Sequence, residues 1–155
     1  MNEMFEIARE ARLQRRSEAR DLVREFAFQD RQTLATTVSE WLVQREPGLR
    51  DIKSGVPSSM DMDYRVFDMN GQRLLVGFLD PTRLATWRHV YEAACIQSQE
   101  SCVESAIVSC GGFDQGVEEE AEASGVKLWG PDSVEMIYFG IAHEPDSHDP
   151  QISLF

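Results

Sequence analysis

Asn70-Gly71, a dipeptide between two apolar runs, sets the strongest limit on how this chain folds. Asn-Gly suits the two-residue turn of a β-hairpin, because both residues tolerate the positive φ that this turn requires. The sequence therefore predicts a strand over residues 62–67 and an antiparallel partner strand over residues 73–79.

A later stretch predicts a parallel strand. Residues 103–110 form a near-continuous apolar run, which is typical of a strand buried on both faces in a parallel part of a sheet. Between the hairpin and this run, Asp80-Pro81-Thr82 has the residue types that cap and begin a helix, which is predicted to continue to Gln99.

The remaining elements follow from hydrophobic periodicity and from the positions of Gly and Pro. They are a long amphipathic helix over 3–28, a helix over 32–45, a short strand over 49–53, a helix over 115–124, a strand over 126–129 and a short last helix that Pro131-Asp132-Ser133 starts and that continues through Tyr138. This order predicts an α/β fold, a mixed sheet with helices on its faces. We expect an N-terminal amphipathic helix at 1–30, one domain at 31–141 and a flexible tail at 142–155.

The chain is acidic, with 27 acidic against 15 basic residues and a net charge of −12. Such a chain is repelled by nucleic-acid phosphates unless its arginines cluster. Arginines do cluster in the N-terminal helix, but acids lie between them, so the pattern mainly predicts a salt-bridged, solvated helix face. The alternative is a DNA contact through Arg12, Arg15, Arg16 and Arg20. The same helix is a candidate surface for pairing with a second copy or with another chain.

Several classes of site are disfavoured by the residue pattern. No run of about 18 apolar residues exists and the opening residues are polar, so we expect a cytoplasmic protein without a membrane partner. Cys95, Cys102 and Cys110 lack zinc-site spacing and favour buried free thiols. His89 has no Ser, Cys or Asp partner at motif spacing, which disfavours a catalytic base, and no motif calls for a cofactor.

The last five residues form a compact recognition motif. Gln151 offers a side-chain amide that can fix orientation, Ser153 lies in the middle, and Ile152, Leu154 and Phe155 supply apolar anchors for preformed pockets. Residues 143–150 contain two prolines and three acids, which predicts a solvated tether. The motif resembles the peptide by which bacterial replication and repair proteins bind the sliding clamp. The alternative is a final strand that folds back on the core.

The central part of the chain contains several motifs of a known nuclease group. They are Asp63 at the opening of a strand, Gly71 in the hairpin turn, the apolar strand 74–76, the segment 107–113 that enters a helix, and the strand 126–130 before the last helix. Together with the element order, these motifs resemble the Mrr-like branch of the restriction-endonuclease superfamily over residues 33–138. The resemblance implies a restriction-endonuclease-like mixed sheet, here with an N-terminal helical arm.

The resemblance also implies a catalytic pattern that this chain does not complete. In the family, an Asp on the first hairpin strand and a Glu or Gln two residues before a Lys on the second hold a divalent metal and activate water. Asp63 fits the first position, but Gly77 and Leu79 stand at the other two. A rescued site would use Asp63 and Asp61 with Glu40 and Asp80 around Mg²⁺, whereas the plainer interpretation is an exposed acidic edge.

These patterns combine into one functional hypothesis and two alternatives. The preferred hypothesis is a catalytically inactive endonuclease-like adaptor or regulator, without a cofactor, that binds the bacterial sliding clamp in DNA replication, repair or mobile-element biology. The first alternative is a Mg²⁺-dependent DNA endonuclease recruited to the clamp. The second is a non-catalytic subunit of a heteromeric nuclease or transposition complex, paired with its partner through the N-terminal helix.

Overall fold

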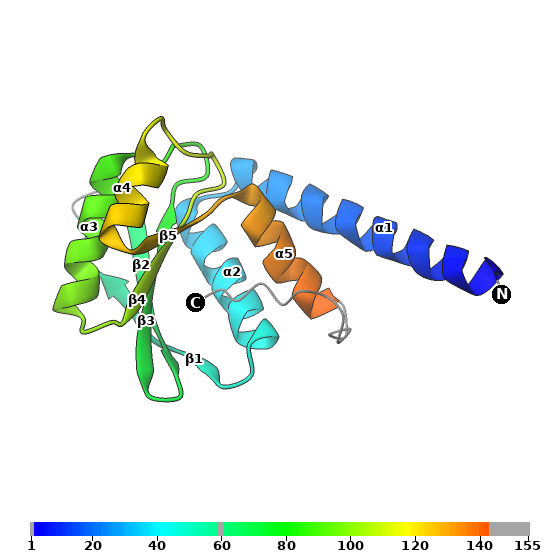
Figure 1. Ribbon diagram of the computed structural model, residues 1–155, viewed down its shortest axis with the longest axis horizontal. Coiled ribbons are helices and arrows are strands. Elements are labelled where there is room, and N and C mark those ends of the chain that lie inside the picture. Colours follow the sequence, from blue (N-terminus) through cyan, green and yellow to red (C-terminus); the bar gives the residue numbers. More distant parts are fainter. Residues whose placement is uncertain (1, 59–60, 143–155) are drawn as a thin grey trace.

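A five-stranded mixed sheet with helices on both faces forms the body of the molecule (Figure 1). The computed structural model describes residues 2–58 and 61–142. The helices are α1 (Asn2–Glu25), the short 3-10 helix η1 (Phe26–Phe28), α2 (Arg31–Arg45), α3 (Trp87–Gln99), α4 (Val117–Ser124) and α5 (Pro131–Ala142). The strands are β1 (Leu49–Val56), β2 (Met62–Met69), β3 (Gln72–Leu79), β4 (Glu104–Val108) and β5 (Val126–Trp129).

The strands lie in the order β1-β2-β3-β4-β5. β1 with β2 and β2 with β3 are antiparallel, whereas β3 with β4 and β4 with β5 are parallel. Asn70 and Gly71 join β2 to β3 with φ of 53° and 87°. The predicted hairpin and the predicted parallel strand are therefore both confirmed.

Two apolar clusters cover the two faces of the sheet. Phe67 and Phe78 belong to the cluster that packs against α2 and α5, and Tyr64 and Leu79 belong to the cluster beneath α3 and α4. Figure 1 shows the same arrangement, with α3 and α4 on one side of the sheet and α2 and α5 on the other. The alternation of side chains along β2 and β3 decides which cluster each residue joins.

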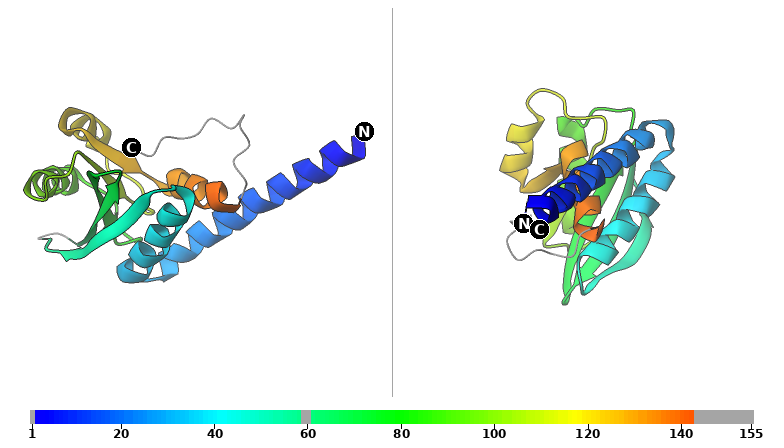
Figure 2. Two further views of the ribbon diagram at one scale, coloured as in Figure 1. Left: turned by 90° about the horizontal axis from the view of Figure 1, so that it is seen from below. Right: turned by 90° about the vertical axis from the view of Figure 1, so that its right-hand side faces the viewer.

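Helix α1 lies outside these layers. Ala19 and Val23 in its last turns are buried, and it packs on α5. Its N-terminal half extends away from the sheet (Figure 2), and there Ile7 and Leu13 remain 67% and 56% exposed. Within the described part of the chain, no helix has both the length and the apolar content that a membrane span requires.

Several element boundaries differ from the sequence-based prediction, and the start of α3 differs most. Helix α3 begins at Trp87 with Thr86 as its N-cap, not at Pro81. The reason is that Asp80 accepts hydrogen bonds from Thr82, which closes a local turn instead of starting a helix. Strand β1 also continues beyond the predicted 49–53 to Val56, with two register shifts against β2.

Candidate functional site

The β2–β3 register determines which residues accompany Asp63. Asp63 pairs with Phe78, and residues directly opposite each other point to the same face of a sheet. Phe78 belongs to the cluster on the α2 and α5 side. Gly77 pairs with Tyr64 instead, so Gly77 and Leu79 face the α3 and α4 side. The two positions at which the family pattern expects a Glu or Gln and a Lys therefore lie on the opposite face from Asp63.

The space above Gly77 is already filled. A Cβ atom at Gly77 would lie 2.7 Å from Cε of Met62 and 2.7 Å from Cε1 of Tyr64. Tyr64 is fully buried, so its ring has little room to move aside. A carboxylate at position 77 is incompatible with this packing, which makes the glycine a structural requirement of the hairpin.

The four carboxylates of the rescued site are each placed differently. Asp61 forms an ion pair with Arg83 at 2.6 Å, Asp63 is half-buried on β2, and Glu40 is exposed on α2. Asp80 follows β3 and accepts hydrogen bonds from the Thr82 backbone N–H at 3.0 Å and the Thr82 hydroxyl at 2.8 Å. Among the residues that the structure describes, no three His, Cys, Asp or Glu side chains come together as a metal site. These residues do not fit a Mg²⁺ ion.

The Thr82 contacts lower the pKa of Asp80 below its ordinary value of 3.8, the backbone N–H chiefly and the hydroxyl second. Because the folded-state pKa lies below the unfolded one, this carboxylate stabilises the fold above the unfolded value, and the contribution is lost as the pH falls through the folded value. We expect Thr82→Val, which removes the hydroxyl alone, to raise the pKa of Asp80 part of the way back. Carboxyl-detected NMR titration measures this, and an unchanged pKa would contradict the role of the hydroxyl.

His89 caps the N-terminus of helix α3. Its side chain is buried, and its Nδ1 accepts a hydrogen bond from the Thr86 backbone N–H at 2.9 Å, which caps α3. Burial lowers the pKa of His89, so the ring stays neutral and able to accept this bond. The Nδ1 atom of His89 is therefore occupied by the helix cap.

Sequence reasoning did not single out the polar contacts beside His89. Glu92 accepts a hydrogen bond from the hydroxyl of Ser58. Burial first, and the Glu92 carboxylate second, raise the pKa of Tyr64, so its phenol stays protonated. The spacing from His89 to Glu92 on a predicted helix was the available signal, but nothing in the sequence placed Ser58 and Tyr64 against it.

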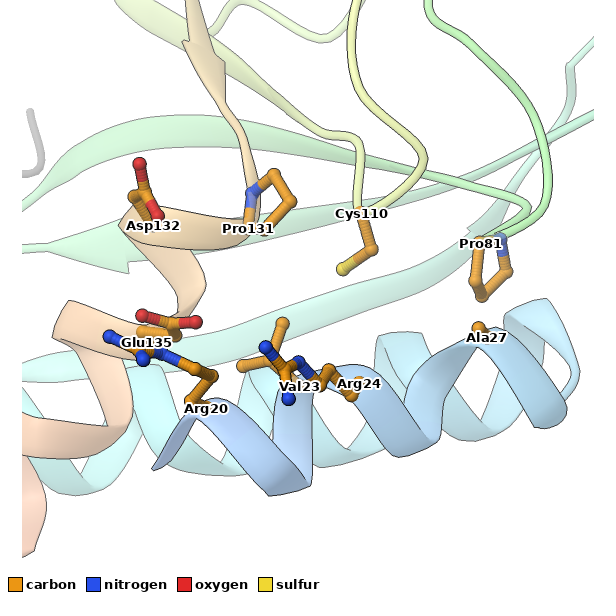
Figure 3. Close-up of a pocket in the computed structure, with 9 residues that line it drawn as sticks. All are labelled: Arg20, Val23, Arg24, Ala27, Pro81, Cys110, Pro131, Asp132 and Glu135. Carbon is orange, nitrogen blue, oxygen red and sulfur yellow. The ribbon is translucent and has the colours of Figure 1, made fainter. Parts of the chain in front are cut away.

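A pocket of about 470 Å³ lies beyond the ends of β3, β4 and β5 (Figure 3). Ligands of α/β proteins often bind at this end of a parallel sheet. The lining residues come from α1 and η1, from the loops after β3 and β4, and from α5: Arg20, Val23, Arg24, Ala27, Pro81, Cys110, Pro131, Asp132 and Glu135. Its charged residues are two arginines and two acids, so the pocket presents no single sign of charge to a ligand.

Two features of the pocket bear on the predicted sites. Cys110 lines it, but burial raises the pKa of the thiol to about 11, so the reactive thiolate is scarce at neutral pH. Arg20, one of the candidate DNA contacts, also lines it, and Arg16 is exposed one turn earlier on α1. The side chains of Arg12 and Arg15 lie outside the described part of the structure.

The predicted clamp-binding residues Gln151, Ile152, Ser153, Leu154 and Phe155 also lie outside the described residues. The described helices and strands end at Ala142. The clamp-binding role of this peptide stays a prediction.

Comparison with known proteins identifies the fold. No family model matches the sequence, and no curated protein is similar to it. EndoMS in its apo form, a restriction-endonuclease-like nuclease, matches the structure with a TM-score of 0.53 and 15% sequence identity, over 64% of this chain and 45% of EndoMS. This chain therefore spans about half the length of EndoMS. The predicted restriction-endonuclease-like mixed sheet flanked by helices is confirmed.

Two further structures match at lower similarity. A protein of unknown function has a TM-score of 0.46 and 13% identity, over 61% of this chain and 54% of that protein. SfsA from Pyrococcus furiosus in complex with Ca²⁺ has a TM-score of 0.38 and 16% identity, over 60% of this chain and 52% of SfsA.

Proposed function

We propose that this chain is a catalytically inactive endonuclease-like adaptor that binds the bacterial sliding clamp through Gln151 to Phe155. The observation that carries the proposal is the motif itself, a polar residue followed by three apolar anchors. Such anchors bind preformed pockets and give a short peptide its specificity. The endonuclease-like domain would then be brought to the clamp as a binding module.

The position of the motif supports this function. The last described helix, α5, ends at Ala142, and residues 143–150 separate it from Gln151. Eight residues can span at most about 29 Å when extended. This reach lets the peptide enter a pocket on the clamp while the domain stays beside the ring.

The hairpin supports the absence of catalysis. The family positions equivalent to the Glu or Gln and the Lys are Gly77 and Leu79, and both lie on the opposite face from Asp63. Asp61 and Asp80, the nearest substitutes in the sequence, are engaged by Arg83 and Thr82. We therefore expect no Mg²⁺-dependent cleavage of DNA by the purified chain.

Calorimetric titration of the full chain into a purified bacterial sliding clamp tests the binding. A motif of this size is expected to bind with a dissociation constant of about 1–10 µM, because a few anchors must offset the ordering of the tether. Leu154→Ala with Phe155→Ala, and truncation before Gln151, should each abolish detectable binding, since both remove the apolar anchors. Ser153→Ala is the matched control and should leave the affinity within about threefold, since no apolar anchor is lost.

Two results would overturn the proposal. The first is an intact chain that does not bind the clamp at all, and the second is a truncated chain that binds as well as the intact one. Cleavage of duplex or branched DNA that requires Mg²⁺ and is lost in Asp63→Ala would replace the adaptor with the nuclease alternative.

A further inference from the structure

Helix α3 presents an apolar stripe to the solvent. Trp87 and Tyr91 are four residues apart, which puts them on one side of the helix, and Leu84 precedes them in the loop that leads into it. The exposed fractions of Leu84, Trp87 and Tyr91 are 50%, 55% and 63%. The helix packs on the sheet through another side, which contains Val90 and Ala93. Packing within the domain does not explain the stripe, and neighbouring exposed apolar side chains are typical of interaction sites.

A second helix starts beside this stripe. Ala85 forms an isolated parallel β-bridge with Phe113, and helices α3 and α4 begin two and four residues after these positions. Leu84 contacts the same loop, since a Cβ atom at Gly112 would lie 3.5 Å from its Cδ2 atom. The first turns of α3 and α4 therefore lie next to each other, on the face of the sheet opposite α2 and α5 (Figure 1).

Helix α4 gives the surface beside the stripe a negative charge. The helix contains no basic residue, and its four acids are Glu118, Glu119, Glu120 and Glu122. The first three lie in its first turn, next to the start of α3. No ion pair between described residues engages any of these carboxylates. Their charge is not compensated within the described domain, so it attracts cationic groups from outside.

Nucleic acid is a poor fit to this surface, although aromatic side chains are able to stack on bases. The guanidinium of Arg88 lies 5.5 Å from the ring centroid of Trp87 and covers one face of the indole. The α4 carboxylates repel phosphates. Trp, Tyr and Arg, in contrast, are the residues that most often anchor contacts between proteins. The surface therefore favours a protein partner that brings apolar side chains together with basic ones.

We propose that a basic amphipathic segment of a partner protein docks on the α3–α4 surface, which comprises Leu84, Trp87 and Tyr91 with the glutamates of α4. Apolar side chains of the segment cover Trp87 and Tyr91, and its lysines or arginines lie beside Glu118 and Glu119. Helices α2 and α5 cover the other face of the sheet, so the contact lies on the opposite side of the domain from α5. This contact is separate from clamp binding and does not depend on it.

Titration of two synthetic peptides into the full chain tests the chemistry of the partner. The first has an amphipathic helical pattern of leucine and lysine, and the second has glutamate in place of every lysine. Tryptophan emission is the readout, because Trp87 is 55% exposed whereas Trp41 and Trp129 pack in the cluster on the other face of the sheet. The leucine–lysine peptide should shift the emission to shorter wavelength, and the leucine–glutamate peptide should bind about tenfold more weakly because like charges then meet. No binding of the first peptide, or equal binding of both, would exclude a basic partner.

Two substitutions test whether the contact lies on α3. In calorimetric titrations, the leucine–lysine peptide should bind Tyr91→Ala about tenfold more weakly than the native chain, because an apolar anchor is lost. Phe28→Ala is the matched control, since Phe28 is 92% exposed on η1, and it should leave the affinity nearly unchanged. Equal losses in the two variants would contradict a specific contact at the stripe.

A pair of charge reversals tests the role of α4. Glu118→Lys with Glu119→Lys should weaken binding of the same peptide about tenfold, because attraction is replaced by repulsion. Glu18→Lys with Glu40→Lys makes the same change in net charge at exposed positions of α1 and α2, and it should have a much smaller effect. Far-UV circular dichroism checks that α4 stays folded. Similar losses in both double variants would reduce the effect to net charge and overturn the docking site.

Other occupants of the stripe would give different results. If a second copy covered it, sedimentation equilibrium would show self-association that Tyr91→Ala abolishes. If single-stranded DNA stacked on it, an oligothymidylate would bind the native chain but not this variant. Either result would replace the basic protein segment as the partner.

Discussion

Gly77→Ala will lower the free energy of unfolding by about 2–3 kcal/mol, as expected when an extra methyl group is forced into a packed core. The new Cβ atom would lie 2.7 Å from both Met62 Cε and Tyr64 Cε1. Met62 can rotate away, but the buried Tyr64 ring lies directly across the hairpin from Gly77. Urea unfolding of the two proteins, followed by circular dichroism, measures the difference.

Two further variants test the cause of this loss. In a Tyr64→Val background the ring is absent, so adding Gly77→Ala should cost less than it does in the native chain. Gly130→Ala is the matched control, because its Cβ atom would meet only the edge of Phe113 at 3.1 Å. A loss at Gly77 that is no larger than the loss at Gly130, or that persists without the Tyr64 ring, would contradict the packing explanation.

Gly111→Ala will be at least as damaging, with a loss of about 3 kcal/mol. A Cβ atom at Gly111 would lie within van der Waals overlap of the Arg83 carbonyl oxygen and 3.0 Å from that of Pro81. Both neighbours are backbone atoms, so the change can be accommodated only by moving the loop that follows β3.

The displaced loop gives Gly111→Ala a second readout. Asp80 and Thr82 belong to the same loop, so their hydrogen bonds should weaken and the pKa of Asp80 should rise toward 3.8. Thermal unfolding and NMR titration of the variant measure the two effects. A variant with native stability would show that the loop can move freely, which contradicts the close packing described above.

The parts of the fold that depend on local signals could be predicted from the sequence. Asn70 and Gly71 adopt the positive φ that their residue types favour, which specifies the turn. The apolar run that forms β4 is almost entirely buried, which specifies the strand. The start of α3 could not be read in the same way. Asp80-Pro81-Thr82 has the residue types of a helix start, but the side chain of Asp80 bonds to Thr82 and the helix begins at Trp87.

The turn is sufficient to predict which face of the hairpin each side chain of β2 and β3 occupies. It does not predict which residues from other elements contact these side chains. A two-residue turn pairs Met69 with Gln72, and counting outward from that pair brings Asp63 opposite Phe78. The separation of Asp63 from Gly77 and Leu79 therefore follows from the sequence once the turn is known. The pairing of Asp61 with Arg83 and the filling of the Gly77 site by Tyr64 depend on tertiary contacts that no local pattern encodes.

The two outer strands of the sheet limit how copies of this protein can polymerise. An unpaired strand edge offers N–H and C=O groups to strands of other molecules and is a starting point for fibres. At one edge, β1 is interrupted by two register shifts and exposes mostly charged or polar side chains. At the other, β5 has four residues, too few for an extended template. Both outer strands of the described sheet therefore disfavour edge-to-edge strand addition, which is the route by which exposed sheet edges lead to amyloid-like aggregates.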